Sequence, residues 1–129
     1  MVEVWIGQKK LYRNEAVHLK GSRLLGFWQT IMSMQERRRR IDEIDGQIVM
    51  LLNRRAVEVK RVAQIKAAVG LPLVDEQRES EVYRRVAAEN FGQIETESVL
   101  RIFNSIVTES RRLQVQALNG VADKGDPVR

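Results

Sequence analysis

The stretch that decides the fold is residues 35–69, QERRRRIDEIDGQIVMLLNRRAVEVKRVAQIKAAV. Its apolar residues recur every three or four positions, the spacing that places side chains on one face of an α-helix. Gly70 and Pro72 follow, in the order that ends a helix. The sequence therefore predicts one helix over 35–69, with an apolar stripe formed by Ile41, Ile44, Ile48, Leu51, Leu52, Val59, Val62 and Ile65.

This helix is too long for its own chain to cover. At 1.5 Å per residue it would reach about 50 Å, whereas a compact domain of about 95 residues has a radius of gyration of about 12 Å. A long apolar stripe that stays in water is unfavourable. We therefore expect a second chain to pack against it.

Two shorter helices are predicted after the first. Asp75 is a good N-cap and Glu76 suits the first turn of a helix that ends at 90–92. Thr96 is expected to cap a third helix, which ends at 119–120. The chain is thus predicted to be all-α, with three helices of unequal length.

The segments on either side of the three helices set the expected domain bounds, and the net charge bears on the kind of partner. We expect a domain over 34–120, an N-terminal extension of unknown order over 1–33 and a disordered tail over 121–129. The net charge is +5, but 34–129 carry 17 basic and 15 acidic residues. This near balance gives little support to nucleic-acid binding.

Several classes of function are disfavoured by composition. The 129 residues include no cysteine and one histidine, His18, which lies in the extension. The sequence therefore lacks the residues needed for a thiolate metal site, a cysteine nucleophile, a charge-relay hydrolase or a multi-histidine metal centre. No apolar run reaches the roughly 18 residues of a membrane span, so we expect a cytoplasmic protein without membrane contact.

Polar residues interrupt all three apolar stripes: Arg38, Asp45, Arg55 and Lys66 on the first, Glu79 on the second, and Ser110 and Gln114 on the third. Burying an unpaired charge costs several kcal/mol, so these positions need a reason. Long side chains can reach solvent at the bundle ends, or pair internally, as Glu79 would with an arginine. Alternatively, an internal cavity with more cations than anions binds a small anion.

Spacing along the first helix sharpens the second explanation. Lys66 follows Arg55 by about three turns, roughly 16 Å along one face. Their long side chains can therefore hold opposite ends of one small molecule. Arg38 precedes Lys66 by nearly eight turns, roughly 42 Å. If Arg38 serves such a site, it serves the site of a partner chain in a two-fold dimer.

The chemistry open to such a site is limited. The core has no histidine and no cysteine, and Ser110 has no nearby base. Positioning and electrostatics remain, which suits a unimolecular rearrangement of an anion.

These residues carry a resemblance to a known family. The stretches RRRRIDEIDGQIVMLLNRRAVEVKRVAQIK, GLPLVDEQRESEV and RIFNSIVTESRRLQ resemble the all-helical (type II) chorismate mutases, over about residues 35–118. The resemblance implies an intertwined homodimeric helical bundle. It also implies rearrangement of chorismate to prephenate, in phenylalanine and tyrosine biosynthesis, with no cofactor and no metal.

The resemblance also implies roles for ten residues. Arg55 and the partner subunit's Arg38 would bind the two substrate carboxylates, helped by Ser110. Lys66 and Gln114 would donate to the ether oxygen. Glu79 would accept a hydrogen bond from the substrate hydroxyl, and Asp75 would contribute through its backbone. Arg78 would lie beside the pocket. Val62 and Val107 would form its apolar wall.

Other functions compete with this one. Isochorismate-pyruvate lyases share the architecture and several of the cations, but Asp75 and Glu79 stand here in the mutase-like arrangement. A basic helical module that binds nucleic acid or a protein is a different class, with salt-dependent affinity as its signature. A third possibility is a mutase that also works as a regulatory partner of another aromatic-pathway enzyme, and no feature of the sequence bears on it.

Overall fold

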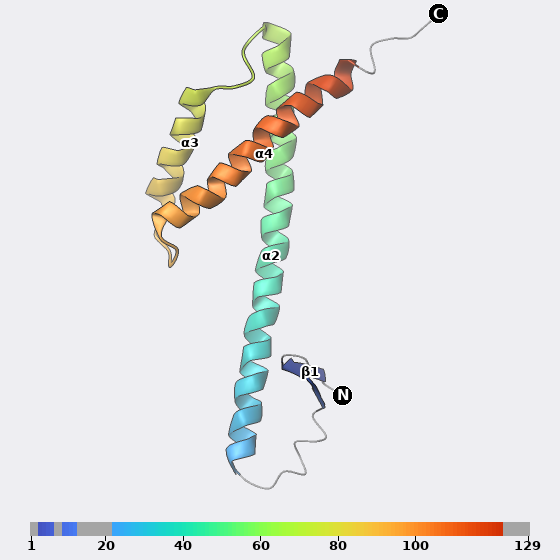
Figure 1. Ribbon diagram of the computed structural model, residues 1–129, viewed down its shortest axis with the longest axis vertical. Helices are drawn as coiled ribbons and strands as arrows, with labels where there is room; N and C mark the ends of the chain where they lie inside the picture. The colour runs from blue at the N-terminus through green and yellow to red at the C-terminus, as the bar shows by residue number, and fades with distance from the viewer. Residues whose placement is uncertain (1–2, 7–8, 13–21, 123–129) are drawn as a thin grey trace, which may run out of the picture. The chain divides into compact units, whose positions relative to one another are not determined.

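The computed structural model describes residues 3–6, 9–12 and 22–122. Within these residues the chain forms strands β1 (Glu3–Ile6) and β2 (Lys9–Tyr12) and helices α2 (Ser22–Val69), α3 (Glu76–Glu89) and α4 (Thr96–Ala122), as Figure 1 shows. The chain divides into two compact units, Met1–Met50 and Leu51–Arg129, and α2 belongs to both. The three predicted helices are confirmed, and His18 lies outside the described residues.

Helix α2 begins earlier than predicted and ends where predicted. It starts at Ser22 rather than Gln35, because residues 22–34 contain no proline, and the mixed aromatic and polar residues there disguise a segment that can still be helical. Its end is a Schellman motif. Gly70 has φ 74°, its N–H donates to Ala67, and the N–H of Leu71 donates to Lys66.

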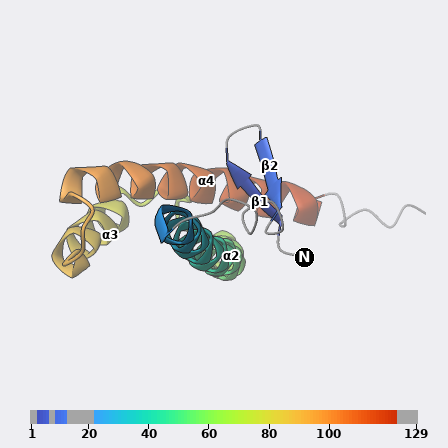
Figure 2. The same cartoon turned by 90° about the horizontal axis from the view of Figure 1, so that it is seen from below.

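The N-terminal unit adds a feature that the helical prediction did not contain. Strands β1 and β2 pair antiparallel, with Glu3 opposite Tyr12 and Ile6 opposite Lys9, and they lie side by side in Figure 2. On α2 the rings of Phe27 and Trp28 meet edge to face at 6.4 Å.

The second unit holds α3 and α4 against the end of α2. The Asp75 carboxylate accepts from the N–H of Arg78 at 2.9 Å, which confirms the predicted N-cap. Tyr83 on α3 donates to Asn104 on α4. Helix α4 crosses the C-terminal part of α2 in Figure 1, with Ala63 and Val107 buried.

The ends of α4 differ from the prediction by one or two residues. The Glu95 carbonyl accepts from the Val99 N–H, so the helix is capped one residue before Thr96. Gly120 does not end it, because α4 continues through Val121 and Ala122. Residues 123–129 of the expected tail lie outside the described residues.

Much of the apolar face of α2 is in water. Every residue from Arg37 to Arg54 is exposed, including Ile41, Ile44, Ile48 and Leu51. None of the described helices is long and apolar enough to span a membrane. A cytoplasmic location stays a prediction.

Candidate active site

A cavity of about 260 Å³ opens between α2, α3 and α4 within the second unit. Each helix contributes polar side chains, because five of the seven polar interruptions of the apolar stripes line this cavity. The other two, Arg38 and Asp45, are exposed. The lining residues are Arg55, Glu58, Val59, Val62, Lys66, Leu73, Asp75, Arg78, Glu79, Val82, Val107, Ser110 and Gln114.

Nine of the ten residues singled out from the sequence line this cavity. The exception, Arg38, is an exposed residue of the N-terminal unit. Among the lining residues that sequence reasoning did not name as part of a site, Val59 lies on the predicted apolar stripe of the first helix, and Val82 is an apolar residue of α3. Glu58 lies next to a stripe, and Leu73 lies between two helices, where no periodicity marks it.

Arg55 and Ser110 join α2 to α4 at the cavity wall. Arg55 donates from Nη1 to the Ser110 hydroxyl, which itself donates to the Ile106 carbonyl at 2.8 Å. Burial lowers the pKa of Arg55 below its usual value, and the nearby positive Arg78 lowers it further. No carboxylate of the described residues forms an ion pair with Arg55, so its guanidinium is available to an anionic ligand.

Lys66 is held by the segment that follows its own helix. Its Nζ donates to the Leu73 carbonyl at 2.9 Å. The Schellman motif at Gly70 reverses the chain, and this reversal brings Leu73 back to the last turn of α2. A lysine near a helix C-terminus is also stabilised by the helix dipole. The ammonium of Lys66, which lines the cavity, is therefore held in place with further donor protons free.

Gln114 carries an unusual polar atom. Its Oε1 is buried and has no hydrogen-bond partner among the described residues. A buried unsatisfied amide oxygen is costly, and such atoms are uncommon in native structures. Because Gln114 lines the cavity, a ligand or water that donates a hydrogen bond would satisfy this oxygen.

Glu79 is the carboxylate on the α3 side of the cavity. Arg111 on α4 donates from Nε to Oε1 at 2.7 Å and from Nη2 to Oε2. The hydrogen bond from Arg111 is the main cause that lowers the pKa of Glu79; Lys66 also lowers it, while burial and Asp75 raise it. The internal pairing of Glu79 with an arginine, which the sequence left open, is thus present together with the cavity.

The cavity wall carries equal numbers of cationic and anionic side chains, so the excess of cations expected from the sequence is not present. The cations are Arg55, Lys66 and Arg78, and the carboxylates are Glu58, Asp75 and Glu79. Arg111 pairs with Glu79, whereas Arg55 and Lys66 form no ion pair among the described residues and donate to Ser110 and to the Leu73 carbonyl. These two cations are therefore the groups that can bind an anion. Among the described residues there is no group of three or more histidine, cysteine, aspartate or glutamate side chains that could hold a metal.

Comparison with known proteins decides the family. The family model described as "Chorismate mutase type II" matches residues 37–115. The chain belongs to this family. The match contains every lining residue of the cavity and Arg38 as well.

Relatives of the type II chorismate mutase family agree with this assignment. The chorismate mutase of Methanocaldococcus jannaschii is 32% identical over 102 residues, which cover 73% of this chain and 96% of that protein. The bifunctional chorismate mutase/prephenate dehydratase of Aquifex aeolicus is 32% identical over 85 residues, 63% of this chain but 24% of the larger protein.

A solved structure of the family has the same fold. Form II of the chorismate mutase from Thermus thermophilus superimposes with a TM-score of 0.62 at 29% identity, and the superposition covers 64% of this chain and 93% of that one. Form I of the same enzyme gives a TM-score of 0.59.

Proposed function

We propose that the cavity binds chorismate and rearranges it to prephenate, the reaction of the family. The observation that carries this proposal is the convergence of Arg55, Lys66, Glu79 and Gln114, from three helices, on one cavity. A pericyclic rearrangement needs neither a nucleophile nor a metal. It needs a reactive conformer and stabilisation of the charge that develops at one oxygen.

Different side chains of the cavity contact different parts of the substrate. Arg55, supported by Ser110, binds one carboxylate, since a planar guanidinium matches a carboxylate with two parallel hydrogen bonds. Lys66 and Gln114 donate to the ether oxygen, which gains negative charge as its bond to carbon breaks. Gln114 would donate through Nε2, since its buried and unpaired Oε1 can only accept.

The remaining groups orient the ring and its hydroxyl. Glu79 accepts the hydrogen bond of the substrate hydroxyl, and Asp75 contributes through its backbone. Arg78 adds positive charge near Arg55. Val62 and Val107 form the apolar wall against which the compact conformer is held.

We further propose that the working unit is a homodimer in which Arg38 completes the site of the partner chain. Support comes from the exposed apolar residues of α2, which no described part of the chain covers. Such a face in water marks a protein interface. A C2 dimer would contain two equivalent sites.

The first experiment separates the candidate functions. The full chain is mixed with chorismate and, separately, with isochorismate. Substrate consumption is followed by absorbance, and the products are identified by mass spectrometry and NMR. Prephenate is the expected product. Pyruvate released from isochorismate would favour the lyase, and no turnover of either substrate by folded protein would overturn both enzymatic functions. Salt-sensitive nucleic-acid binding by such a protein would favour the basic module.

A second experiment tests the shared site. Arg38→Ala and Arg55→Ala chains, each inactive alone, are unfolded together and refolded at equal amounts. Half of the dimers are then mixed and one of their two sites is intact, so activity should return to about a quarter of the wild-type value. Two different affinity tags verify the mixed dimer. A verified mixed dimer without activity contradicts a site shared between chains.

A further inference from the structure

We propose that Arg111 is a positioning residue of this site: from α4 its guanidinium fixes the plane and place of the Glu79 carboxylate on α3, and so keeps that carboxylate aimed at the substrate. This inference rests on the proposed function. Arg111 does not line the cavity, so it would act through Glu79 alone.

The contact is a two-pronged one. Arg111 Nε lies 2.7 Å from Glu79 Oε1, and Arg111 Nη2 donates to Oε2. Two parallel hydrogen bonds between planar groups fix both rotation and distance, which a single bond does not. Each carboxylate oxygen keeps a free lone pair for a substrate hydroxyl.

Of the two side chains, Glu79 belongs to the cavity wall and Arg111 does not. The Glu79 side chain is 19% exposed and lines the cavity, whereas the Arg111 side chain is 50% exposed and is absent from the lining. The bonds from Arg111 therefore hold Glu79 without adding a group to the cavity wall.

The charges around Glu79 show what Arg111 prevents. Lys66 on α2 acts on Glu79 across the cavity, and Asp75 acts on it from the start of its own helix. Arg78 also lines the cavity, and Glu76 and Tyr83 act on Arg111. Without Arg111, the carboxylate would turn toward Lys66, the remaining cation that acts on it. A Glu79–Lys66 pair would remove the proposed acceptor of the substrate hydroxyl and occupy the proposed donor to the ether oxygen.

One turn of α4 gives this arrangement. Ser110 and Gln114 are one turn apart and share a helix face, and both line the cavity. Arg111 is offset from that face and reaches α3. This turn of α4 therefore supplies Ser110 and Gln114 to the cavity, and it also supplies Arg111, which supports Glu79.

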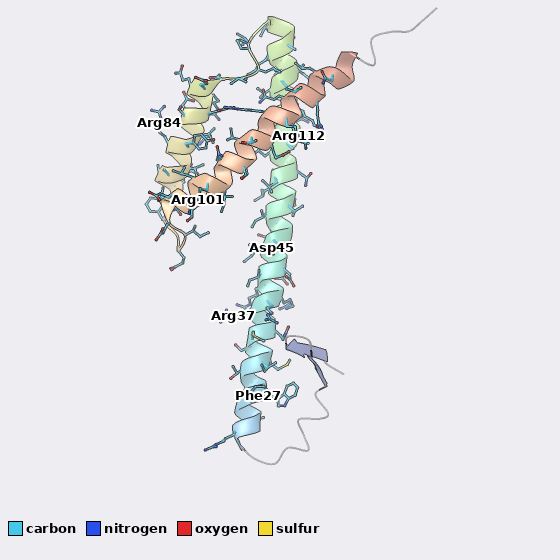
Figure 3. The ribbon with its side chains drawn as sticks, viewed as in Figure 1. Phe27, Arg37, Asp45, Arg84, Arg101 and Arg112 are labelled. Carbon is cyan, nitrogen blue, oxygen red and sulfur yellow. The ribbon has the colours of Figure 1, made fainter. Side chains whose placement is uncertain are left out.

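The test uses two substitutions of Arg111 and a matched control. Arg112 is the control, because it is the next residue on α4 and pairs with Glu109 of its own helix at 2.8 Å. Figure 3 labels it on the part of α4 that crosses α2. Arg111→Met should lower kcat/KM tenfold or more, as a misplaced group does, while Arg112→Met stays within about twofold.

Two readouts distinguish positioning from simple packing. Arg111→Lys restores the charge and one hydrogen bond, so it should recover part of the lost kcat. The pH profile should also change. Arg111 lowers the pKa of Glu79, so its removal raises that pKa. Glu79 must be ionised to accept the substrate hydroxyl; the acid limb of kcat/KM should therefore move to higher pH in Arg111→Met.

A double variant completes the test. In a Glu79→Gln background, Arg111→Met should lower kcat/KM by no more than about twofold further, because the group that Arg111 positions is already changed. An equal loss in both backgrounds, or Arg111→Met that matches Arg112→Met in an active wild type, would overturn the positioning role. A wild type without mutase activity would instead overturn the proposed function, and that result precedes any variant.

Discussion

Helix α2 carries the same apolar spacing from residue 35 to its end at Val69, but the two halves of this stretch differ in what covers them. From Arg37 to Arg54 every residue is exposed. In the following turns Val59 and Lys66 are partly buried, and Ala63 is 0% exposed. The helical period of the apolar residues thus indicates which face of the helix is packed against other residues. It does not indicate whether those residues belong to the same chain.

The uncovered half has a measurable driving force for association. Ile48 is 49% exposed, and Ile41, Ile44 and Leu51 are similarly exposed. Burying the rest of each such side chain contributes about 1 kcal/mol. In a two-fold dimer the same residues are buried on both chains. Association of two copies through this stripe is therefore favoured by several kcal/mol.

The largest effect is expected from a charge placed on this stripe. Ile48→Glu would put two carboxylates, one from each chain, into the proposed interface, and burying an unpaired charge costs several kcal/mol. The dimer should dissociate at micromolar protein. Activity should fall by at least a hundredfold, because each site loses the partner's Arg38. Light scattering with size-exclusion chromatography measures the mass, and the mutase assay measures the activity.

The neighbouring residue supplies the control for Ile48→Glu. Gln47→Glu introduces the same carboxylate beside the stripe, at a residue that is already polar and exposed. It should remain dimeric and active. A fully active monomeric Ile48→Glu chain would show that the uncovered half of α2 plays no part in the reaction.

A smaller but still large effect is expected when a cation is removed from the covered half. Lys66→Ala should lower kcat/KM by about 10², the scale of losing one donor to a developing negative charge. Arg40→Ala removes a cation from the uncovered half, where Arg40 pairs with Glu36 at 3.2 Å. It should change kcat/KM by less than twofold, since exposed pairs contribute little. A loss below threefold for Lys66→Ala would exclude Lys66 from the mechanism.

The local signals in the sequence were sufficient for most of the fold. The Asp75 cap and the Gly70 stop act within a few residues, so they could be predicted directly. The start of α2 could not, because residues 22–34 lack a clean period although they favour a helix. Gly120 was misread as a stop for a related reason, since a glycine in a helix interior costs only about 1 kcal/mol and neighbouring turns can offset it.

The candidate site was predictable where its residues interrupt an apolar stripe. Arg55, Lys66, Glu79 and Gln114 could be found in this way. Leu73 acts through its backbone carbonyl, which any residue would supply, and so carries no signal in the sequence. The pairing of Arg111 with Glu79 joins two helices and depends on packing that the period of one helix does not encode.

The smallest effect concerns the turn that ends the covered half of α2. Gly70 has a positive φ, and a left-handed conformation costs a residue with a Cβ roughly 1–2 kcal/mol. Gly70→Ala should lower the free energy of unfolding, measured with urea, by that amount, although no atom lies within 4 Å of the added Cβ. It should also lower kcat slightly, because the turn sets the Leu73 carbonyl against Lys66.

A matched glycine inside α4 separates backbone conformation from the added methyl group. Gly120→Ala makes the same chemical change, also in open space. There it should raise stability by up to about 1 kcal/mol, because alanine favours a helix. If the two substitutions change the free energy of unfolding in opposite directions, the backbone conformation at Gly70, and not the methyl group, maintains the turn beside Lys66. If both raise it, the turn at Gly70 relaxes without cost.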